Sequence, residues 1–580
     1  MHLNRRSVAK SKECQKKQPE PGALLAVSWS RIGHIEIVQQ LFVHTTYYLL
    51  LATILCWGGA YLHAARDLRA PAVVAWVREN WPGLLIAGAV TAIAASAIEP
   101  ALRVLSDEAN LLGTSKNFFA SKTATFTVSG KYYYDSYWDI DVAVDRRPPL
   151  FPFLVSLVHA VRGYSPENVF LFNLLVLAAV LLVSYRLAKS AGGETFGVVT
   201  ALLVAAHPVT LISARSGGFD LLAVLLALLV LKSLHDYLRD RTPAGLAITW
   251  LNLCLLAEVR YETALFIPPI VALLLLFKLV PWSTLRPYAA VYAFTPVYLL
   301  PRVLQSLLRG NVPEQEPGAV TFSVQNFLSN TREYFEPVLS PFESFPAHSA
   351  VVIALGLVGC WFWLKWLWRA VKGRAWSAPE LRFALFAGCW MLVQVVVVFT
   401  YVWGRAQYPS AARLVIAIDT FFSFAAAWAL TRLLERWRPF VPRLLSAAIL
   451  LVGLPVASQH RMLNRLTQTR ESAATWRFFE RLGDKRILIV TDRPNHFTIM
   501  NYGAMNFESA RRDPYLFTAL ERRLFQDIYV IQQIRLSTNE ALPRYAMWAD
   551  RKLDPVYEFQ NDADVLVRIS RVERIKTRTE

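Results

Sequence analysis

Residues 169–185 read VFLFNLLVLAAVLLVSY, an apolar run that contains no charged side chain. A helix of about 20 apolar residues spans the hydrocarbon core of a bilayer, which is about 30 Å thick. Within lipid, only helices and closed barrels satisfy all of their own backbone hydrogen bonds. The run lacks the alternation of polar and apolar residues that is typical of a barrel strand. This stretch therefore predicts a transmembrane helix.

Runs of this kind recur along the whole chain of 580 residues. They lie near 41–62, 84–105, 167–188, 195–213, 220–238, 245–261, 264–281, 288–308, 348–369, 383–403, 412–434 and 440–458. The expected fold is an α-helical polytopic membrane protein with about 11–12 transmembrane helices.

The composition supports this class and excludes others. Hydrophobic residues make up 54% of the chain and charged residues 18%, and the mean hydropathy is +0.33. Soluble domains usually carry about 25% charged residues, so a soluble globular enzyme is excluded. The net charge of +18 is typical of a membrane protein that holds Lys and Arg in its cytoplasmic loops. No basic stripe with interleaved aromatic residues lies on a soluble segment, so nucleic acid is not an expected partner.

The spacing of potential ligands predicts neither a metal nor a cofactor. The five cysteines form no CxxC pair, so neither a disulfide framework nor a thiolate metal site is indicated. No His-x-x-His sequence and no carboxylate cluster with metal spacing occurs. We therefore expect chemistry that uses the side chains alone.

The chain changes character after Ser458, where charged residues replace the spanning runs. We predict a basic N-terminal segment over 1–40, a transmembrane domain over 41–459 and a small soluble α/β domain over 460–580. Within the last of these, short apolar runs predict strands near 485–492, 526–534 and 563–570, with a helical region over 497–525. Arg493-Pro494-Asn495 follows the first strand in place of a Gly-rich loop, so no nucleotide site is expected there.

The distribution of Lys and Arg predicts the orientation in the membrane. These residues crowd the connections near 365–382 and 432–443, which the positive-inside rule places in the cytoplasm. Counting spans outward places outer loop one (106–166), a second outer loop (309–347) and the C-terminal domain on the extracytoplasmic side. A full span at 41–62 would put the basic N-terminus outside, so an interfacial or re-entrant helix is an alternative there. No Asn begins an Asn-x-Ser/Thr sequence, which agrees with a bacterial inner membrane.

Outer loop one contains two motifs. Ser106-Asp107-Glu108 follows an apolar helix directly, and Arg146-Arg147-Pro148-Pro149-Leu150 comes forty residues later. The apolar segment after the two prolines ends at Gly163 and is too short for a span, so we expect a helix lying along the interface. Between the motifs lies a group of aromatic residues that could anchor in the headgroup region: Tyr132, Tyr133, Tyr134, Tyr137 and Trp138.

In this order of motifs the sequence resembles the membrane glycosyltransferases of the C superfamily. It is most similar to the branch of lipid A aminoarabinose transferases and protein O-mannosyltransferases, which use polyprenyl-phosphate sugars. The resemblance covers roughly residues 84–460 and implies that Asp107 is the catalytic base or the carboxylate that orients the acceptor. It also implies that Arg147 faces the lipid phosphate and that Asp220 is a second catalytic carboxylate. The family often has Arg-Tyr shortly after Asp-Glu, whereas Asn110 and Leu111 stand here.

The other candidate residues come from the same surface. Glu108 belongs to the Asp-Glu pair, and Arg260 and Arg413 match basic positions of the family. Arg215 is a further candidate for binding the donor phosphate. The resemblance implies a polyprenyl-phosphate sugar as donor, an acceptor at the extracytoplasmic face and no cofactor.

Elementary chemistry assigns the same roles. Transfer of a sugar from a lipid phosphate needs a base for the acceptor proton, and such a base typically contributes about 10²–10⁴ in rate. The leaving phosphate gains negative charge, so cations must already be in place to stabilise it. Arg serves this purpose because its planar group offers a fork of donors. Because the lipid tail stays in the bilayer, these groups must lie at the membrane surface.

Plainer interpretations are open for several candidates. Arg260 could pair only with Glu262 at a helix end, and Asp220 could be an N-cap after two glycines. Arg215, Arg405 and Arg413 could anchor in headgroups. His159 and His207 are predicted to pack rather than to bind a ligand.

Three rival functions are also open. A secondary transporter would hold its charges near the midplane within an internal repeat, and neither feature is seen here. A lipid-linked oligosaccharide ligase or polymerase would carry other loop motifs. A scaffold would leave the one-sided polar groups unexplained.

Overall fold

The computed structural model describes residues 21–65, 70–133, 135–308, 320–340, 347–373, 376–458, 467–513, 515–521, 526–541, 552–562 and 564–573. The basic residues 1–20, Tyr134 and part of the predicted loop 309–347 lie outside this set.

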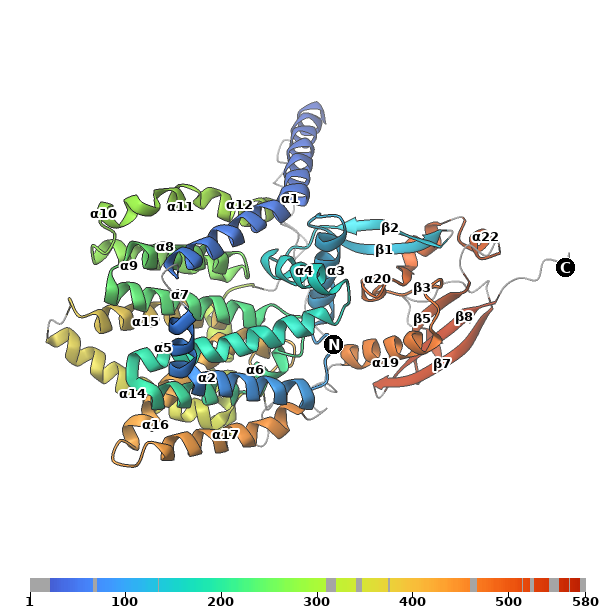
Figure 1. Cartoon of the computed structure of the whole chain (residues 1–580). Helices are drawn as coiled ribbons and strands as arrows, with labels where there is room; N and C mark the ends of the chain where they lie inside the picture. The colour runs from blue at the N-terminus through green and yellow to red at the C-terminus, as the bar shows by residue number, and fades with distance from the viewer. Residues whose placement is uncertain are drawn as a thin grey trace, which may run out of the picture.

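Two regions make up the described chain, a bundle of helices and a sheet domain at one end of it (Figure 1). Among the described residues, eight helices are long and apolar enough to cross a membrane. They are α1 (Pro21–Ala64), α2 (Ala70–Ala97), α5 (Asn168–Ala205), α7 (Asp220–Asp240), α14 (Ala350–Lys372), α15 (Pro379–Thr400), α16 (Ile416–Leu433) and α17 (Phe440–Ser458). The predicted class of polytopic helical membrane protein is thereby confirmed.

Several predicted spans are shorter than expected. The runs 245–261 and 264–281 correspond to α8 (Pro243–Ala257) and to the segment Glu262–Leu276, and both fall short of a full crossing. The run 288–308 is divided among η2 (Arg286–Tyr288), α11 (Ala289–Ala293) and α12 (Thr295–Leu308). Prolines explain much of this, because proline lacks a backbone N–H and favours the first turn of a new helix. Apolar composition alone does not reveal these breaks.

The long α5 contains a reversal at two glycines. Gly192 and Gly193 have non-helical backbone angles, and Gly193 has a φ of +86°. Tyr185 packs against Val198 across the bend, although a straight helix would separate two such residues by about 20 Å. A Cβ atom at Gly197 would lie 2.8 Å from the carbonyl oxygen of Tyr185, so the bare glycine allows the close approach. The predicted runs 167–188 and 195–213 are therefore two arms of a hairpin.

The sheet domain combines two distant parts of the chain. Its eight strands follow the order β2-β1-β4-β3-β5-β8-β7, with β6 paired to β5. They are β1 (Phe126–Tyr133), β2 (Ser136–Ala143), β3 (Leu488–Val490), β4 (Gly503–Met505), β5 (Ile528–Arg535), β6 (Glu540–Ala541), β7 (Leu553–Asp562) and β8 (Val565–Val572). The strands β3, β4 and β5 are parallel, and the other pairings are antiparallel.

The strand predictions near 485–492, 526–534 and 563–570 are confirmed by β3, β5 and β8. The region 497–525 was expected to be helical, and that prediction is wrong for β4, which lies between α20 (Asn495–Thr498) and α21 (Phe507–Arg512). A strand of three residues that includes a glycine leaves no periodic signal in the sequence.

The hairpin of β1 and β2 comes from outer loop one. Gly130 pairs with Ala504, and the Tyr132 hydroxyl donates to the backbone oxygen of Asn501 at 2.9 Å. The rings of Tyr132 and Tyr137 lie edge to face at 5.4 Å. These two tyrosines thus pack within the sheet domain, whereas the sequence suggested a headgroup anchor. Only the pairing with a strand 370 residues away explains them, and sequence patterns do not report such pairings.

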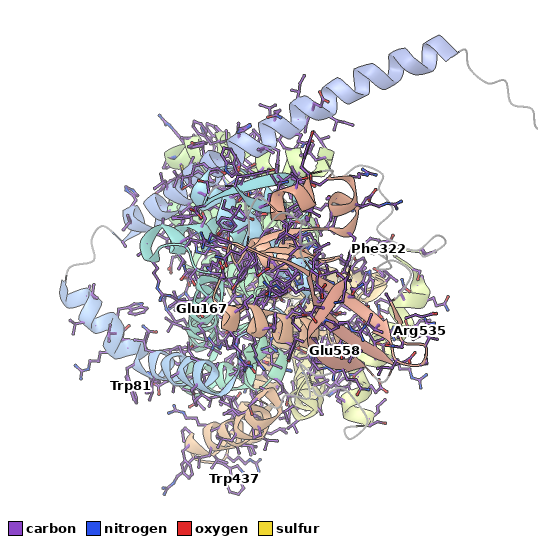
Figure 2. The ribbon with its side chains drawn as sticks, turned by 90° about the vertical axis from the view of Figure 1, so that its right-hand side faces the viewer. Trp81, Glu167, Phe322, Trp437, Arg535 and Glu558 are labelled. Carbon is purple, nitrogen blue, oxygen red and sulfur yellow. The ribbon has the colours of Figure 1, made fainter. Side chains whose placement is uncertain are left out.

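Helix α3 (Leu105–Ala120) joins the two regions. It contacts α4 (Leu150–Arg162) within the bundle and β1 and α20 in the sheet domain. The Asn495 amide donates to Asn110 of α3 at 2.7 Å. In Figure 2, Trp81 of α2 and Trp437 beyond α16 point away from the body of the protein, and both are more than half exposed. Exposed apolar side chains of this kind are expected on helices that face lipid.

Candidate active site

Asp107 lies in the first turn of α3, where the partial positive charge of a helix N-terminus favours a carboxylate. Its two carboxylate oxygens accept hydrogen bonds from different arginines. Arg147 donates to Oδ1, and Arg413 donates from Nη2 to Oδ2 at 2.6 Å. Burial by itself would raise the pKa of Asp107, but Arg413 and Arg147 hold that pKa below its usual range. Asp107 is therefore ionised at neutral pH and keeps 23% of its side chain exposed.

Arg147 is fixed by the residues on either side of it. Asp145 accepts a hydrogen bond from the Arg147 side chain at 2.8 Å and another from its backbone N–H at 3.2 Å. Pro148 and Pro149 follow, and α4 begins at Leu150. Proline locks its own φ and restricts the preceding residue, so the chain around Arg147 has few alternatives. The Arg-Pro-Pro motif therefore holds the Arg147 guanidinium group in a defined position.

Asp220 is the first residue of α7 and is almost fully buried. Arg260 donates to its Oδ1, and Arg413 donates from Nη1 to its Oδ2 at 3.2 Å. The N-cap residue of this helix is Phe219, so the capping interpretation does not describe Asp220. Arg260 also forms an ion pair with Glu262, with 2.5 Å between its Nε and Oε1 of Glu262. It thus pairs with both carboxylates rather than with Glu262 alone.

Arg413 connects the two catalytic candidates. It lies in the short helix η3 (Ala412–Val415) ahead of α16 and touches both Asp107 and Asp220. The ring of Phe219 lies beneath Arg260 and Arg413, at 5.4 and 5.9 Å from their guanidinium carbons. Stacking of this kind stabilises a cation while leaving its N–H groups free to bind an anion. A headgroup anchor would not be so enclosed, since only 13% of the Arg413 side chain is exposed.

Glu108 lies behind this cluster rather than in it. Its Oε2 accepts hydrogen bonds from the backbone N–H groups of Arg103 at 2.8 Å and Gly217 at 2.9 Å. A Cβ atom at Gly218 would lie 3.0 Å from Asp220 Oδ2 and 3.3 Å from Glu108 Oε1, so the glycine admits both carboxylates. Burial raises the pKa of Glu108 to about 7. We interpret this residue as support for the Gly217–Gly218 turn.

Replacing Glu108 with Gln is expected to flatten the dependence of stability on pH. A carboxyl with a raised pKa stabilises the folded state below its unfolded value of about 4.3, and this stabilisation is lost as the pH rises through about 7. The full change is on the order of 4 kcal/mol. Thermal unfolding of the wild type and Glu108→Gln between pH 5 and 8 measures the difference, and parallel curves would contradict the assignment.

Arg215 is not part of the cluster. Its Nε donates to the backbone oxygen of Ile98 at 2.9 Å, and its own backbone oxygen accepts from Ala101 at 3.1 Å. Arg405 is likewise separate, because it pairs with Glu333 and is half exposed. The structure thus brings together five candidates, and it adds Asp145 and Phe219, which the sequence reasoning missed. Their closeness to Arg147 and Asp220 in the chain was the available signal.

An apolar cavity extends away from these arginines. A small hollow of about 20 Å³ is lined by Asp220, Arg260 and Arg413. It shares Ala227, Ala417 and other side chains with a cavity of about 690 Å³. That cavity is lined mainly by apolar residues of α5, α7, α14, α15 and α16. The cluster of arginines and carboxylates therefore lies at one end of an apolar cavity.

The chain is similar to known proteins in both sequence and fold. A family model described as dolichyl-phosphate-mannose-protein mannosyltransferase matches residues 146–303, a segment that includes Arg147, Asp220 and Arg260. No curated protein sequence matches the chain.

Two solved structures are similar over most of the chain. ArnT from Cupriavidus metallidurans bound to undecaprenyl phosphate has a TM-score of 0.50 at 16% identity, covering 86% of this chain and 98% of that one. The apo state of the same protein has a TM-score of 0.51 at 15% identity, with the same coverage. At these identities the similarity establishes the fold. The chain has the fold of the membrane glycosyltransferases of the C superfamily, as its two loop motifs predicted.

Proposed function

We propose that this protein is a membrane glycosyltransferase that moves a single sugar from a polyprenyl phosphate to an acceptor at the extracytoplasmic face. The observation that carries the proposal is the meeting of three arginines with Asp107 and Asp220, flanked by Asp145 and Glu262, at the end of an apolar cavity. A lipid phosphate has the matching chemistry, an anion joined to a long apolar chain. The fold supports the proposal, because a structurally similar protein is described as bound to undecaprenyl phosphate.

The arginines would receive the donor phosphate. Arg147, Arg260 and Arg413 now pair with carboxylates, and a bound phosphate would take over part of each fork of donors. When the bond from the anomeric carbon to the phosphate oxygen breaks, the negative charge on the phosphate grows. Cations that are already in place stabilise this charge without further rearrangement.

Asp107 would act as the base. An acceptor hydroxyl or amine attacks the anomeric carbon from the face opposite the phosphate, and its proton passes to a carboxylate oxygen of Asp107. One bond to the anomeric carbon forms as the other breaks, so the transfer inverts the configuration. Asp220, shared by Arg260 and Arg413, holds these two cations in register. Glu108 supports the turn behind them, and Arg215 lies outside the cluster.

The lipid tail would occupy the apolar cavity. Replacing Ala384 with Trp fills a part of the cavity that is not shared with the hollow beside the arginines. We expect the KM for a long-chain donor to rise about tenfold, equivalent to about 1.4 kcal/mol. The KM for a short-chain donor should change little, because its tail does not reach the new side chain. Leu392→Trp on the exposed face of α15 is the matched control, and equal effects of both variants would contradict this placement.

We propose a bacterial inner membrane as the location, with the sheet domain on the outside. This rests on the positive-inside distribution of Lys and Arg and on the absence of Asn-x-Ser/Thr sequences. The acceptor, whether lipid, protein or glycan, would approach between the sheet domain and α3. Labelling of single cysteines from outside, at Asp141 on β2 for example, tests the orientation.

A transfer assay tests the function. The purified full chain in lipid vesicles is given radiolabelled polyprenyl-phosphate sugars and candidate acceptors, and we expect label to appear on the acceptor. Solute uptake is measured in the same vesicles. Uptake without any binding or turnover of a lipid-linked sugar would favour the transporter and overturn the proposal.

A further inference from the structure

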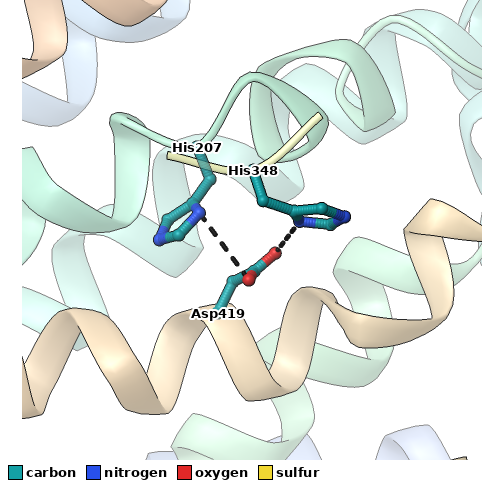
Figure 3. A group of neighbouring side chains, drawn as sticks. All are labelled: His207, His348 and Asp419. Atoms are coloured by element: carbon teal, nitrogen blue, oxygen red, sulfur yellow. Dashed lines mark hydrogen bonds and ion pairs between the residues drawn. The ribbon is translucent and has the colours of Figure 1, made fainter. Parts of the chain in front are cut away.

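Three side chains of types that can bind a metal ion meet inside the helical bundle, apart from the arginine site (Figure 3). His207 precedes α6 (Pro208–Ser213), His348 stands just ahead of α14, and Asp419 lies in the first turn of α16. One nitrogen or oxygen from each falls within 4.8 Å of the others. The side chains are 0%, 0% and 1% exposed. Residues so far apart in the sequence show no ligand spacing, and the sequence pattern therefore predicted only that His207 packs.

If both histidines are neutral, they have too few N–H groups for the acceptors that face them in this cluster. His348 lies between two acceptors, with Nδ1 at 2.8 Å from Asp419 Oδ2 and Nε2 at 3.2 Å from the backbone oxygen of Ala406. A neutral imidazole carries one N–H, so one of these contacts has no hydrogen. His207 Nδ1 already accepts the backbone N–H of Ser349 at 3.2 Å, yet it faces Asp419 Oδ1 at 3.7 Å. The cluster therefore needs a further positive charge.

A metal ion would satisfy all three side chains, whereas an added proton would satisfy only some of them. A proton added to His348 completes that ring's two contacts and leaves His207 Nδ1 facing a carboxylate oxygen. A cation among the three groups is shared by all of them. Two imidazole nitrogens and one carboxylate oxygen form a ligand set that Zn²⁺ favours, with ligand distances of about 2.0–2.2 Å. Binding requires His207 Nδ1 to exchange its contact with Ser349 for the metal.

The surroundings resemble those of metal ligands in general. Ligating histidines usually donate their other N–H to a backbone oxygen or a carboxylate, and ligating carboxylates are themselves hydrogen-bonded. Nε2 of His348 faces the Ala406 oxygen, and the Tyr334 hydroxyl donates to Asp419 Oδ1 at 3.0 Å. We propose that His207, His348 and Asp419 bind one divalent transition metal, Zn²⁺ in the first place, with a fourth coordination position left for a further ligand.

The site would hold together segments that lead to the arginines. From His207 the chain runs through α6 to the Gly217–Gly218 turn and Asp220. Asp419 lies six residues after Arg413, and Ala406 belongs to the loop that carries Ser410, whose backbone oxygen accepts from Arg413 at 3.2 Å. These three ligands are positioning residues, since none touches the arginine cluster. The metal proposal does not depend on glycosyl transfer, because its tests measure metal and stability.

Metal content and thermal unfolding of the purified full chain test the site. We expect about one zinc per chain, lost on treatment with a chelator and regained when Zn²⁺ alone is added. The midpoint of unfolding should fall on chelation and recover with the metal. A wild type that holds no metal, and whose midpoint responds to neither chelator nor Zn²⁺, would overturn the proposal.

Variants separate ligands from neighbours. Asp419→Asn should lose the bound zinc, whereas Tyr334→Phe should keep it with about tenfold weaker affinity. His159→Gln is the matched control, because His159 is a buried histidine that contacts Ser115 and Asn168 instead. Equal zinc in Asp419→Asn and the wild type, or equal loss in His159→Gln, would contradict the site. The chelation result on the wild type stands even if a variant fails to fold.

Discussion

Asp107→Asn is expected to lower the rate of sugar transfer by about 10²–10⁴-fold while the protein remains folded. The amide has the shape of the carboxylate, and its one oxygen can still accept from one of the two arginines, but it cannot take the acceptor proton. Initial rates with a radiolabelled polyprenyl-phosphate sugar, at saturating donor and acceptor, measure the effect.

The control for this variant lies in the same outer segment. Asp141 is exposed on β2, so Asp141→Asn removes a carboxylate of equal charge outside the arginine cluster. It should transfer sugar at the wild-type rate. Because Arg413 and Arg147 lower the pKa of Asp107 below its usual value of about 3.9, the base should stay ionised at pH 5. Full activity in Asp107→Asn would contradict the assignment of this residue as the base.

Arg413→Ala is expected to cost at least about 10²-fold in transfer and to destabilise the protein. Removing one partner of a buried ion pair typically costs about 3–5 kcal/mol, because the remaining charge is left uncompensated. Here two carboxylates, Asp107 and Asp220, would lose the same partner. The leaving phosphate would also lose one of its three guanidinium groups. Transfer rates and thermal unfolding are measured together.

Two further variants separate charge from geometry. Arg413→Lys keeps the charge, but an ammonium group cannot offer the forked donors that span two carboxylates, so only partial recovery is expected. Arg405→Gln removes a half-exposed arginine eight residues earlier and should leave the transfer rate unchanged. Wild-type rates in Arg413→Lys would show that a point charge suffices, and they would contradict the proposed role of the fork.

Part of the site was visible in the sequence because it follows from local rules. A carboxylate at a helix start, an arginine held by two prolines and a glycine pair before Asp220 all act within a few residues. Arg260 and Arg413 needed the resemblance to a known family to become candidates, since isolated arginines near helix ends have many uses. Arg215 looked equivalent to them in sequence, but the fold turns it toward the backbone of Ile98.

The class of the protein was determined by the sequence alone. Many long apolar runs such as 169–185 predict a membrane protein. Whether such a run spans the bilayer depends on its composition and length and not on contacts with distant residues. The strands near 488–490, 528–535 and 565–572 were predictable for a similar reason, as short apolar runs need only local burial.

Tertiary structure alone decided which residues meet. The pairing of β1 with β4, the sharing of Arg413 between Asp107 and Asp220, and the meeting of His207 with Asp419 each join segments more than 190 residues apart. Contacts of this kind depend on how whole helices pack, and packing leaves no periodic trace in the sequence. The chain by itself therefore names the candidates, and the fold decides which of them form a site.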